Sequence, residues 1–131
     1  LKQLCAGNHI ENRVTFHGRV HDIRAIWKTN HILLLPSHME GMPLVIVEAM
    51  LCGRPCVATN VGGITEWLEE DRSGFIAAEV NKTSFATAME KAWAAQTAWE
   101  SMGIYAHDRA AALYDPDAGK TLLENIQSDI I

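Results

Sequence analysis

Apolar residues in this chain gather in short runs that are separated by turns rich in glycine, proline and small polar residues. Residues 32–35 form an uninterrupted apolar run that ends at Pro36, and a second run follows Pro55. Short runs without polar alternation are typical of strands that are covered on both faces in a parallel sheet. We predict four strands, at residues 13–17, 31–36, 55–59 and 74–78.

Helical spacing alternates with these runs. Ile23, Ile26 and Trp27 recur at three- and four-residue intervals, which predicts a helix over residues 22–29. Pro43 suits the first position of a helix because it has no N–H to lose, and Gly53 suits a helix end. We therefore predict helices at 1–7, 22–29, 43–52 and 64–70, and from about residue 83 onward with breaks near Gly103 and at Asp115-Pro116-Asp117.

Strands that alternate with helices indicate an α/β, Rossmann-like fold, in which a parallel sheet carries helices on both faces. The length of 131 residues suits one domain. A doubly wound domain normally opens with a glycine-rich strand–turn–helix, and this chain shows none and has only about four strands. We therefore interpret residues 1–131 as a single, partial domain. Ligands of such sheets bind at the carboxyl ends of the strands.

The overall charge restricts the partners. Eleven Lys and Arg against sixteen Asp and Glu give a net charge of −5, which argues against a nucleic-acid surface. No apolar run approaches the roughly 20 residues of a membrane span. Cys52 and Cys56 are separated by a predicted helix-to-strand turn, so they are no CxxC pair, and we interpret them, with Cys5, as reduced, buried thiols of a cytosolic protein.

Two carboxylates, Glu40 and Glu48, carry the candidate chemistry. Glu48 lies in a predicted helix that is otherwise wholly apolar, where an ionised carboxylate sealed without a partner costs several kcal/mol. Its side chain therefore reaches a cleft or holds a specific donor. Glu40 lies in the loop just upstream, and the free amides of Leu44 and Val45 at the helix N-terminus favour an anion in the same place. Hydroxyl-accepting carboxylates beside an anion site suggest a sugar nucleotide.

Purely structural interpretations of the same residues stay open. Glu48 could form a structural ion pair with Arg19 or Arg54, and Glu40 could be a solvated loop residue. The residues Glu66, Glu69, Glu70 and Asp71 are expected to form a solvated acidic face.

The run from Glu40 to Glu48 resembles the E-x7-E motif of retaining GT-B glycosyltransferases, the group 1 or family 4 enzymes that use nucleotide sugars. The flanking residues resemble that family almost position by position, and the similarity extends from about residue 4 to residue 115. The matching stretches are Arg13-Val14-Thr15-Phe16-His17-Gly18, Leu35-Pro36-Ser37-His38-Met39-Glu40-Gly41-Met42-Pro43-Leu44, Val47-Glu48-Ala49-Met50, Gly53-Arg54-Pro55, Asn60-Val61-Gly62-Gly63-Ile64-Thr65-Glu66 and Ser73-Gly74-Phe75.

The resemblance implies a C-terminal, donor-binding domain of a hexosyltransferase-type enzyme. By it, Glu40 is the catalytic residue and contacts sugar hydroxyls, and Glu48 contacts the ribose. Arg19 and Val20 would lie by the base. The remaining donor-binding residues would be Gly41, Met42, Pro43, Leu44 and Val45, with Ser37, His38, Gly62 and Gly63 as possible lining of the cleft. No metal or other cofactor is expected, because basic side chains and the helix N-terminus stabilise the departing diphosphate.

The chain also departs from the family. Two further strands, whose loops supply an Arg and a Lys for the diphosphate, are absent, as is the N-terminal domain that would bind an acceptor glycan or lipid. We therefore expect the chain alone to be inactive, and the parent enzyme to be cytoplasmic, with possible attachment to the inner membrane through the missing part. The absent strands would lie between residues 13–17 and 31–36. An exposed strand edge would then favour a homodimer.

Two other functions remain open at this stage. A nucleotide-sugar epimerase shares the fold but not this motif context. A non-catalytic nucleotide-sugar-binding module would share both the fold and the site. A longer reading frame with an acceptor domain would separate the transferase from the binding module.

Overall fold

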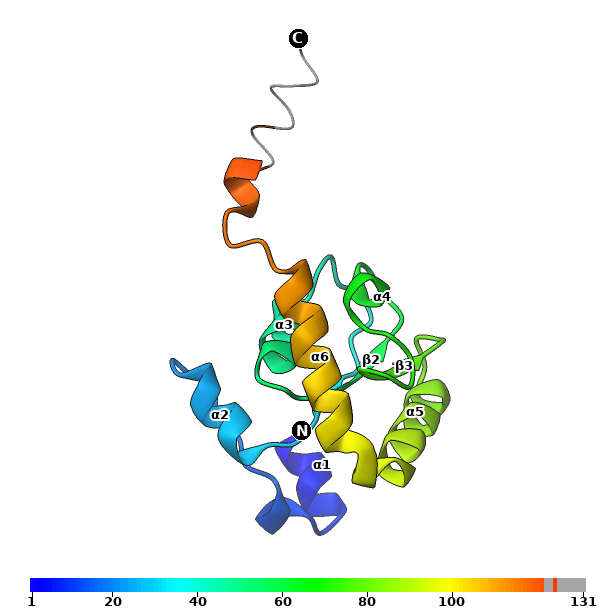
Figure 1. Ribbon diagram of the computed structural model, residues 1–131. Coiled ribbons are helices and arrows are strands. Elements are labelled where there is room, and N and C mark those ends of the chain that lie inside the picture. Colours follow the sequence, from blue (N-terminus) through cyan, green and yellow to red (C-terminus); the bar gives the residue numbers. More distant parts are fainter. Residues whose placement is uncertain (122–123, 125–131) are drawn as a thin grey trace.

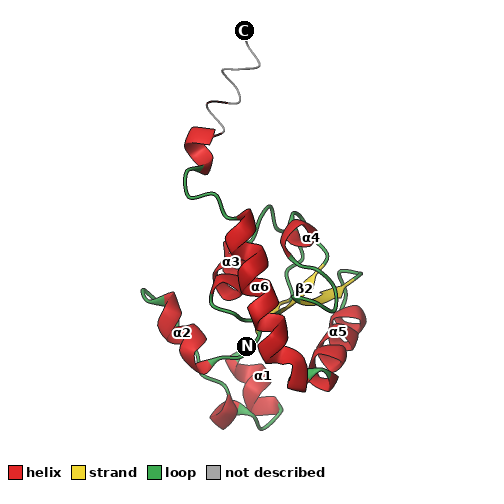
Figure 2. Ribbon diagram, viewed as in Figure 1, coloured by secondary structure: helices red, strands yellow, loops and turns green. Residues whose placement is uncertain are grey.

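The computed structural model describes residues 1–121 and residue 124 of the protein (Figure 1). Short helices and strands alternate over its first two thirds, and longer helices follow (Figure 2). In chain order the elements are α1 (Lys2–Gly7), the 3-10 helix η1 (Glu11–Arg13), α2 (Ile23–Thr29), β1 (Leu33–Leu35), α3 (Leu44–Leu51), β2 (Cys56–Thr59), α4 (Ile64–Trp67), β3 (Gly74–Ala77), α5 (Lys82–Ala94), the 3-10 helix η2 (Gln96–Ala98) and α6 (Trp99–Leu113).

The sheet is parallel, with the strand order β1-β2-β3. Leu33 pairs with Cys56, and Cys56 pairs in turn with Gly74. Helix α3 connects β1 to β2, and α4 connects β2 to β3, as parallel strands require a crossover. The predicted α/β class with a parallel sheet is confirmed.

Successive residues of β2 face opposite sides of the sheet and enter two separate cores. Cys56 and Ala58 are buried in the core formed with α3 and α6. Val57 is buried in the other core, against Phe75 and the helix α5. Figure 1 shows α5 on one side of the sheet and α3 with α6 on the other, so both faces are covered by helices.

The predicted strand at residues 13–17 is wrong. Its first residue ends η1, and the backbone at Val14 is extended (φ −121°, ψ 124°) without pairing to any strand in the described part of the chain. Phe16 is 46% exposed. An extended segment becomes a strand only when a neighbour accepts its backbone hydrogen bonds, and here β1 is paired with β2 alone. The sheet of the described residues therefore has three strands.

The predicted helix break near Gly103 is also wrong, because α6 continues from Trp99 through Leu113. The interruption comes earlier, at η2. Gly103 lies where α6 crosses the end of α3, and a Cβ atom built on it would overlap the carbonyl group of Gly53. The glycine permits close contact between α6 and the turn after α3, and it does not end a helix. Helix α6 does end before Asp115-Pro116-Asp117, as predicted.

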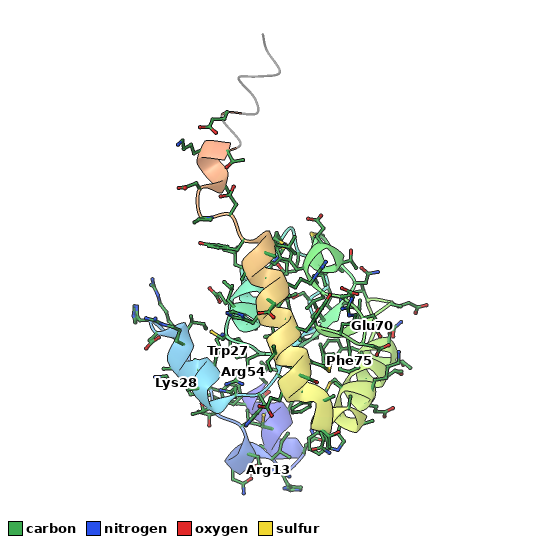
Figure 3. All side chains as sticks on the ribbon, in the orientation of Figure 1. Arg13, Trp27, Lys28, Arg54, Glu70 and Phe75 are labelled. Atoms are coloured by element: carbon green, nitrogen blue, oxygen red, sulfur yellow. The ribbon has the colours of Figure 1, made fainter. Side chains whose placement is uncertain are left out.

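The N-terminal segment attaches to the rest of the molecule through Trp27. This side chain is 5% exposed and belongs to the core of α3 and α6. Arg54 donates from Nε and Nη2 to the carbonyl oxygen of Trp27, at 2.9 and 2.6 Å. Figure 3 shows Trp27 and Arg54 side by side near α2. The guanidinium of Arg54 therefore pins α2 to the turn after α3.

The expected acidic face is wrong for two of its four members. Glu69 accepts hydrogen bonds from Tyr105 Oη and Arg72 Nη1, both at 2.6 Å, and these bonds hold the pKa of Glu69 below its ordinary value. Glu70 accepts a 2.6 Å hydrogen bond from the amide of Ile76 in β3. These two carboxylates join the turn after α4 to α6 and to the sheet.

The three cysteines are free, but only Cys56 is fully buried. Burial raises the pKa of its thiol far above the usual range, so it stays protonated and unreactive. Cys5 and Cys52 are half-buried, which corrects the expectation that all three are buried. Among the described residues, no helix combines the length and the apolar character needed to cross a bilayer.

Candidate functional site

The candidate site lies where β1 and β2 end. The loop at residues 36–43 follows β1 and leads into α3, and the pair Gly62-Gly63 follows β2 and leads into α4. Because the strands are parallel, both loops meet at the same edge of the sheet. The amide of Gly63 donates a 2.8 Å hydrogen bond to the carbonyl oxygen of Gly41. The structure therefore brings the predicted glycine pair against the loop that carries Glu40.

Gly62 supports this loop through its backbone. Its φ is +56°, in the left-handed region, and a Cβ atom at this position would overlap the carbonyl groups of Glu40 and Gly41. Only glycine fits here without moving the Glu40 loop. The sequence analysis expected Gly62 and Gly63 to line the cleft but did not anticipate this contact. The sequence feature that could have indicated this close contact is a Gly-Gly pair directly after a buried strand.

Within the loop, Ser37 and Glu40 are joined by a hydrogen bond. Ser37 Oγ donates to Glu40 Oε1 at 2.7 Å, and both side chains are half-buried. One oxygen of the Glu40 carboxylate is thereby held by its own loop. Glu40 is therefore not a freely solvated loop residue.

The start of α3 is open. Pro43 is the N-cap rather than the first helical residue, with extended dihedral angles (φ −75°, ψ 104°), and no side chain caps this end. The first helical hydrogen bond runs from the amide of Ile46 to the carbonyl of Pro43. Leu44 is 70% exposed. The first amides of the helix, from Leu44 and Val45, are the ones left free for an anion at such a terminus.

Glu48 lies one turn further along α3 and is exposed. Four of the eight residues of the helix are buried: Ile46, Val47, Ala49 and Met50. Leu44 and Glu48, four residues apart, share the exposed face. Within the described residues the carboxylate of Glu48 has neither a hydrogen bond nor an ion pair, and Arg54 is bound to Trp27 instead. The alternative of a structural ion pair with Arg54 is therefore not what the structure contains.

Arg19 and Val20 lie in the segment between η1 and α2 and are exposed. In the described part of the chain, no hydrogen bond or ion pair joins Arg19 to Glu48 or to the Glu40 loop. The structure thus brings Ser37, Gly41, Gly62 and Gly63 to Glu40 but gives no such link for Arg19 and Val20.

His38 lines a groove of about 580 Å³ beside the Glu40 loop. The groove opens between the ends of the strands and the start of α5. Its other lining residues are Pro36, Thr59, Val80, Asn81, Lys82, Phe85, Ala86 and Met89. Thr59 was not predicted as a lining residue, although its position as the last residue of a buried strand was a usable signal. A larger cavity, of about 760 Å³, contains none of the predicted site residues.

Comparison with known proteins gives a consistent picture. The profile of the family described as "Glycosyl transferases group 1" matches residues 1–95. N-acetyl-alpha-D-glucosaminyl L-malate synthase of Bacillus anthracis is 39% identical over 82 residues, which cover 63% of this chain and 21% of that protein. D-inositol 3-phosphate glycosyltransferase of Mycolicibacterium gilvum is 35% identical over 105 residues, which cover 78% of this chain and 23% of that protein.

Solved structures agree. The Anabaena protein HepE in complex with UDP superposes with a TM-score of 0.83 at 27% identity, covering 96% of this chain and 35% of that one. Sucrose-phosphate synthase of Thermosynechococcus elongatus, at 24% identity, shares the fold with a TM-score of 0.81. The match covers 98% of this chain and 33% of that one. The chain spans about a fifth of the length of the curated relatives and a third of the solved ones. It belongs to the group 1 glycosyltransferases, and its parallel α/β fold matches part of their GT-B fold.

Proposed function

We propose that this chain is the donor-binding part of a retaining GT-B glycosyltransferase, and that it binds a nucleoside-diphosphate sugar at the carboxyl ends of β1 and β2. One observation carries the proposal: Glu40 and Glu48 flank the uncapped start of α3, at the edge of the sheet where ligands of such folds bind. The likeness to HepE, which was solved with UDP and with UDP and glucose, supports a nucleotide-sugar donor.

The proposed roles follow from the chemistry of each group. Carboxylates accept hydrogen bonds from hydroxyls, so Glu40 takes the sugar and Glu48, exposed one turn into α3, takes the ribose. The amides of Leu44 and Val45 and the dipole of α3 offset the charge that develops on the departing diphosphate. Glu40 is the proposed catalytic residue, because in this arrangement it is the carboxylate assigned to the reacting sugar.

We propose that transfer needs no metal ion and no other cofactor. The helix N-terminus supplies part of the positive potential that a metal would otherwise provide. Basic side chains outside this chain supply the rest, and the acceptor, a glycan or a lipid, binds there as well. Donor binding should therefore be unchanged by EDTA.

We place the enzyme in the cytoplasm, with attachment to the inner membrane only through parts outside this chain. The three free cysteines support a reducing compartment. For the isolated chain we propose a homodimer through the outer edge of β1, since β1 pairs only with β2 in the described residues.

Calorimetric titration of the chain with UDP, GDP and ADP, and with the corresponding glucose nucleotides, tests the donor proposal. We expect one base to be preferred, and the sugar nucleotide to bind more tightly than its diphosphate. No binding of any of the six ligands would contradict the donor site. Binding without transfer in the longer reading frame that contains this chain would leave a non-catalytic nucleotide-sugar-binding module.

A further inference from the structure

We infer that Ser37 is a positioning residue: its hydroxyl holds the carboxylate of Glu40 in the orientation that receives the sugar of the donor. This inference rests on the proposed donor site and adds to it a residue that governs recognition of the sugar but not of the nucleotide.

The first support is the hydrogen bond itself. Ser37 Oγ lies 2.7 Å from Glu40 Oε1, and the two residues are three positions apart in one loop. The pair is half-buried, so water competes less for the carboxylate than it would at an open surface. A hydrogen bond to an ionised group is also roughly twice as strong as a neutral one. The bond therefore restricts the rotamer of Glu40.

The second support is that the backbone of Glu40 is fixed independently. The neighbouring loop places Gly62 against the carbonyl groups of Glu40 and Gly41, with no room for a side chain. The amide of Gly63 also donates to the carbonyl of Gly41 at 2.8 Å. With the backbone held from one loop and the carboxylate held by Ser37, Glu40 is anchored at both ends.

This anchoring has a consequence for binding. Oε1 is engaged by Ser37, whereas Glu40 Oε2 has no hydrogen-bond partner among the described residues and can accept from a sugar hydroxyl. Since the carboxylate is already ordered, the ligand does not have to order it, which favours binding. Glu48 and the start of α3 lie outside this hydrogen bond. Loss of the Ser37 hydroxyl should therefore weaken contacts to the sugar and leave contacts to the nucleotide unchanged.

Isothermal titration of the chain with UDP and with UDP-glucose tests the inference, or with the preferred base if the first titration finds another. Ser37→Ala should weaken UDP-glucose binding about 10-fold, the scale of one hydrogen bond to a charged group, with UDP binding unchanged. Ser37→Thr keeps a hydroxyl and should restore most of the affinity. Ser101→Ala is the matched control, because within the described residues the Ser101 hydroxyl donates to the carbonyl of Ala98 alone, in the turn before α6.

The outcomes separate the two claims. If Ser37→Ala binds both ligands as the unaltered chain does, the inference is wrong and the donor site stands. An equal loss for UDP and UDP-glucose would show a merely structural serine and would overturn it as well. If the unaltered chain binds neither ligand, the donor site itself fails, and the inference falls with it.

Discussion

Glu40 and Glu48 have different surroundings, although only seven residues lie between them in one motif. Glu40 is half-buried and bonded to Ser37, whereas Glu48 is exposed on α3 with no partner among the described residues. The sequence could predict that Glu48 is not sealed in its apolar helix without a partner, because burying an unpaired charge costs several kcal/mol. It could not predict the bond to Ser37, which depends on the backbone conformation within the 36–43 loop, or the contact with Gly62, which depends on how two loops close on each other.

We predict that the two glutamates act on different halves of the donor. Glu40→Ala should weaken binding of the sugar nucleotide about 10- to 100-fold and leave the diphosphate unaffected, whereas Glu48→Ala should weaken both ligands by a similar factor. Neither side chain belongs to a buried core, so the thermal midpoint should change little. Glu11→Ala, at an exposed position in η1, is the control. Full affinity for both ligands in both variants would contradict the assigned roles.

Glu69 makes stability depend on pH. Hydrogen bonds from Tyr105 and Arg72 lower its folded-state pKa, so the folded state binds its proton less readily than the unfolded chain. The contribution of Glu69 to folding stability is therefore complete when the pH lies above the ordinary pKa of 4.5. It is lost as the pH falls through the lower pKa of the folded state. Urea unfolding at pH 7 and below pH 4 should show that acid lowers the free energy of unfolding less for Glu69→Gln than for the unaltered chain. An identical loss would show that Glu69 is not coupled to folding.

At the scale of elements, local pattern and tertiary contact disagree in two places. The runs at 31–36, 55–59 and 74–78 contain strands because each has a neighbour to pair with. The run at 13–17 also contains strand-forming residues, Val14 and Phe16, but it has no strand neighbour in the described part of the chain, so its backbone stays unpaired. Pairing is a property of the sheet and cannot be seen in five residues of sequence.

Gly103 is the second position at which local pattern and tertiary contact disagree. Alanine in place of glycine improves helix propensity by up to about 1 kcal/mol. The new Cβ, however, would overlap the backbone carbonyl of Gly53, which cannot swing aside as a flexible side chain could. Overpacking of this kind typically costs about 1–3 kcal/mol, so it outweighs the propensity gain. We expect Gly103→Ala to lower the free energy of unfolding in urea.

Gly7→Ala is the matched control for this variant. Gly7 is also helical, at the end of α1, and a Cβ atom there would have nothing within 4 Å. Its unfolding free energy should stay constant or rise slightly. Equal stability of Gly103→Ala and the unaltered chain would mean that α6 shifts to accept the methyl group.

At the scale of the whole molecule, the sequence predicted the parallel α/β arrangement because alternation of buried runs and helical spacing persists along the chain. It did not predict which apolar residues remain uncovered. Leu34 is 45% exposed although it lies in a strand, and Trp93 on α5 is 65% exposed. Together with Ile32 and Met89 they line an apolar groove of about 590 Å³ beside the free edge of β1. We call this surface the β1 groove.

The β1 groove decides how the isolated chain should associate. Strand β1 has only three residues, so edge pairing alone offers few hydrogen bonds, and burial of Leu34 and Trp93 must supply most of the driving force.

We expect a dimer of twice the 14.5 kDa chain mass in sedimentation equilibrium, and a monomer for Leu34→Lys, which puts a charge into the groove. Leu113→Lys, at a position of similar exposure (46%) at the end of α6, should remain dimeric. A monodisperse monomer of the unaltered chain in light scattering would refute association through this edge, and a dimer that survives Leu34→Lys would move the interface to another surface.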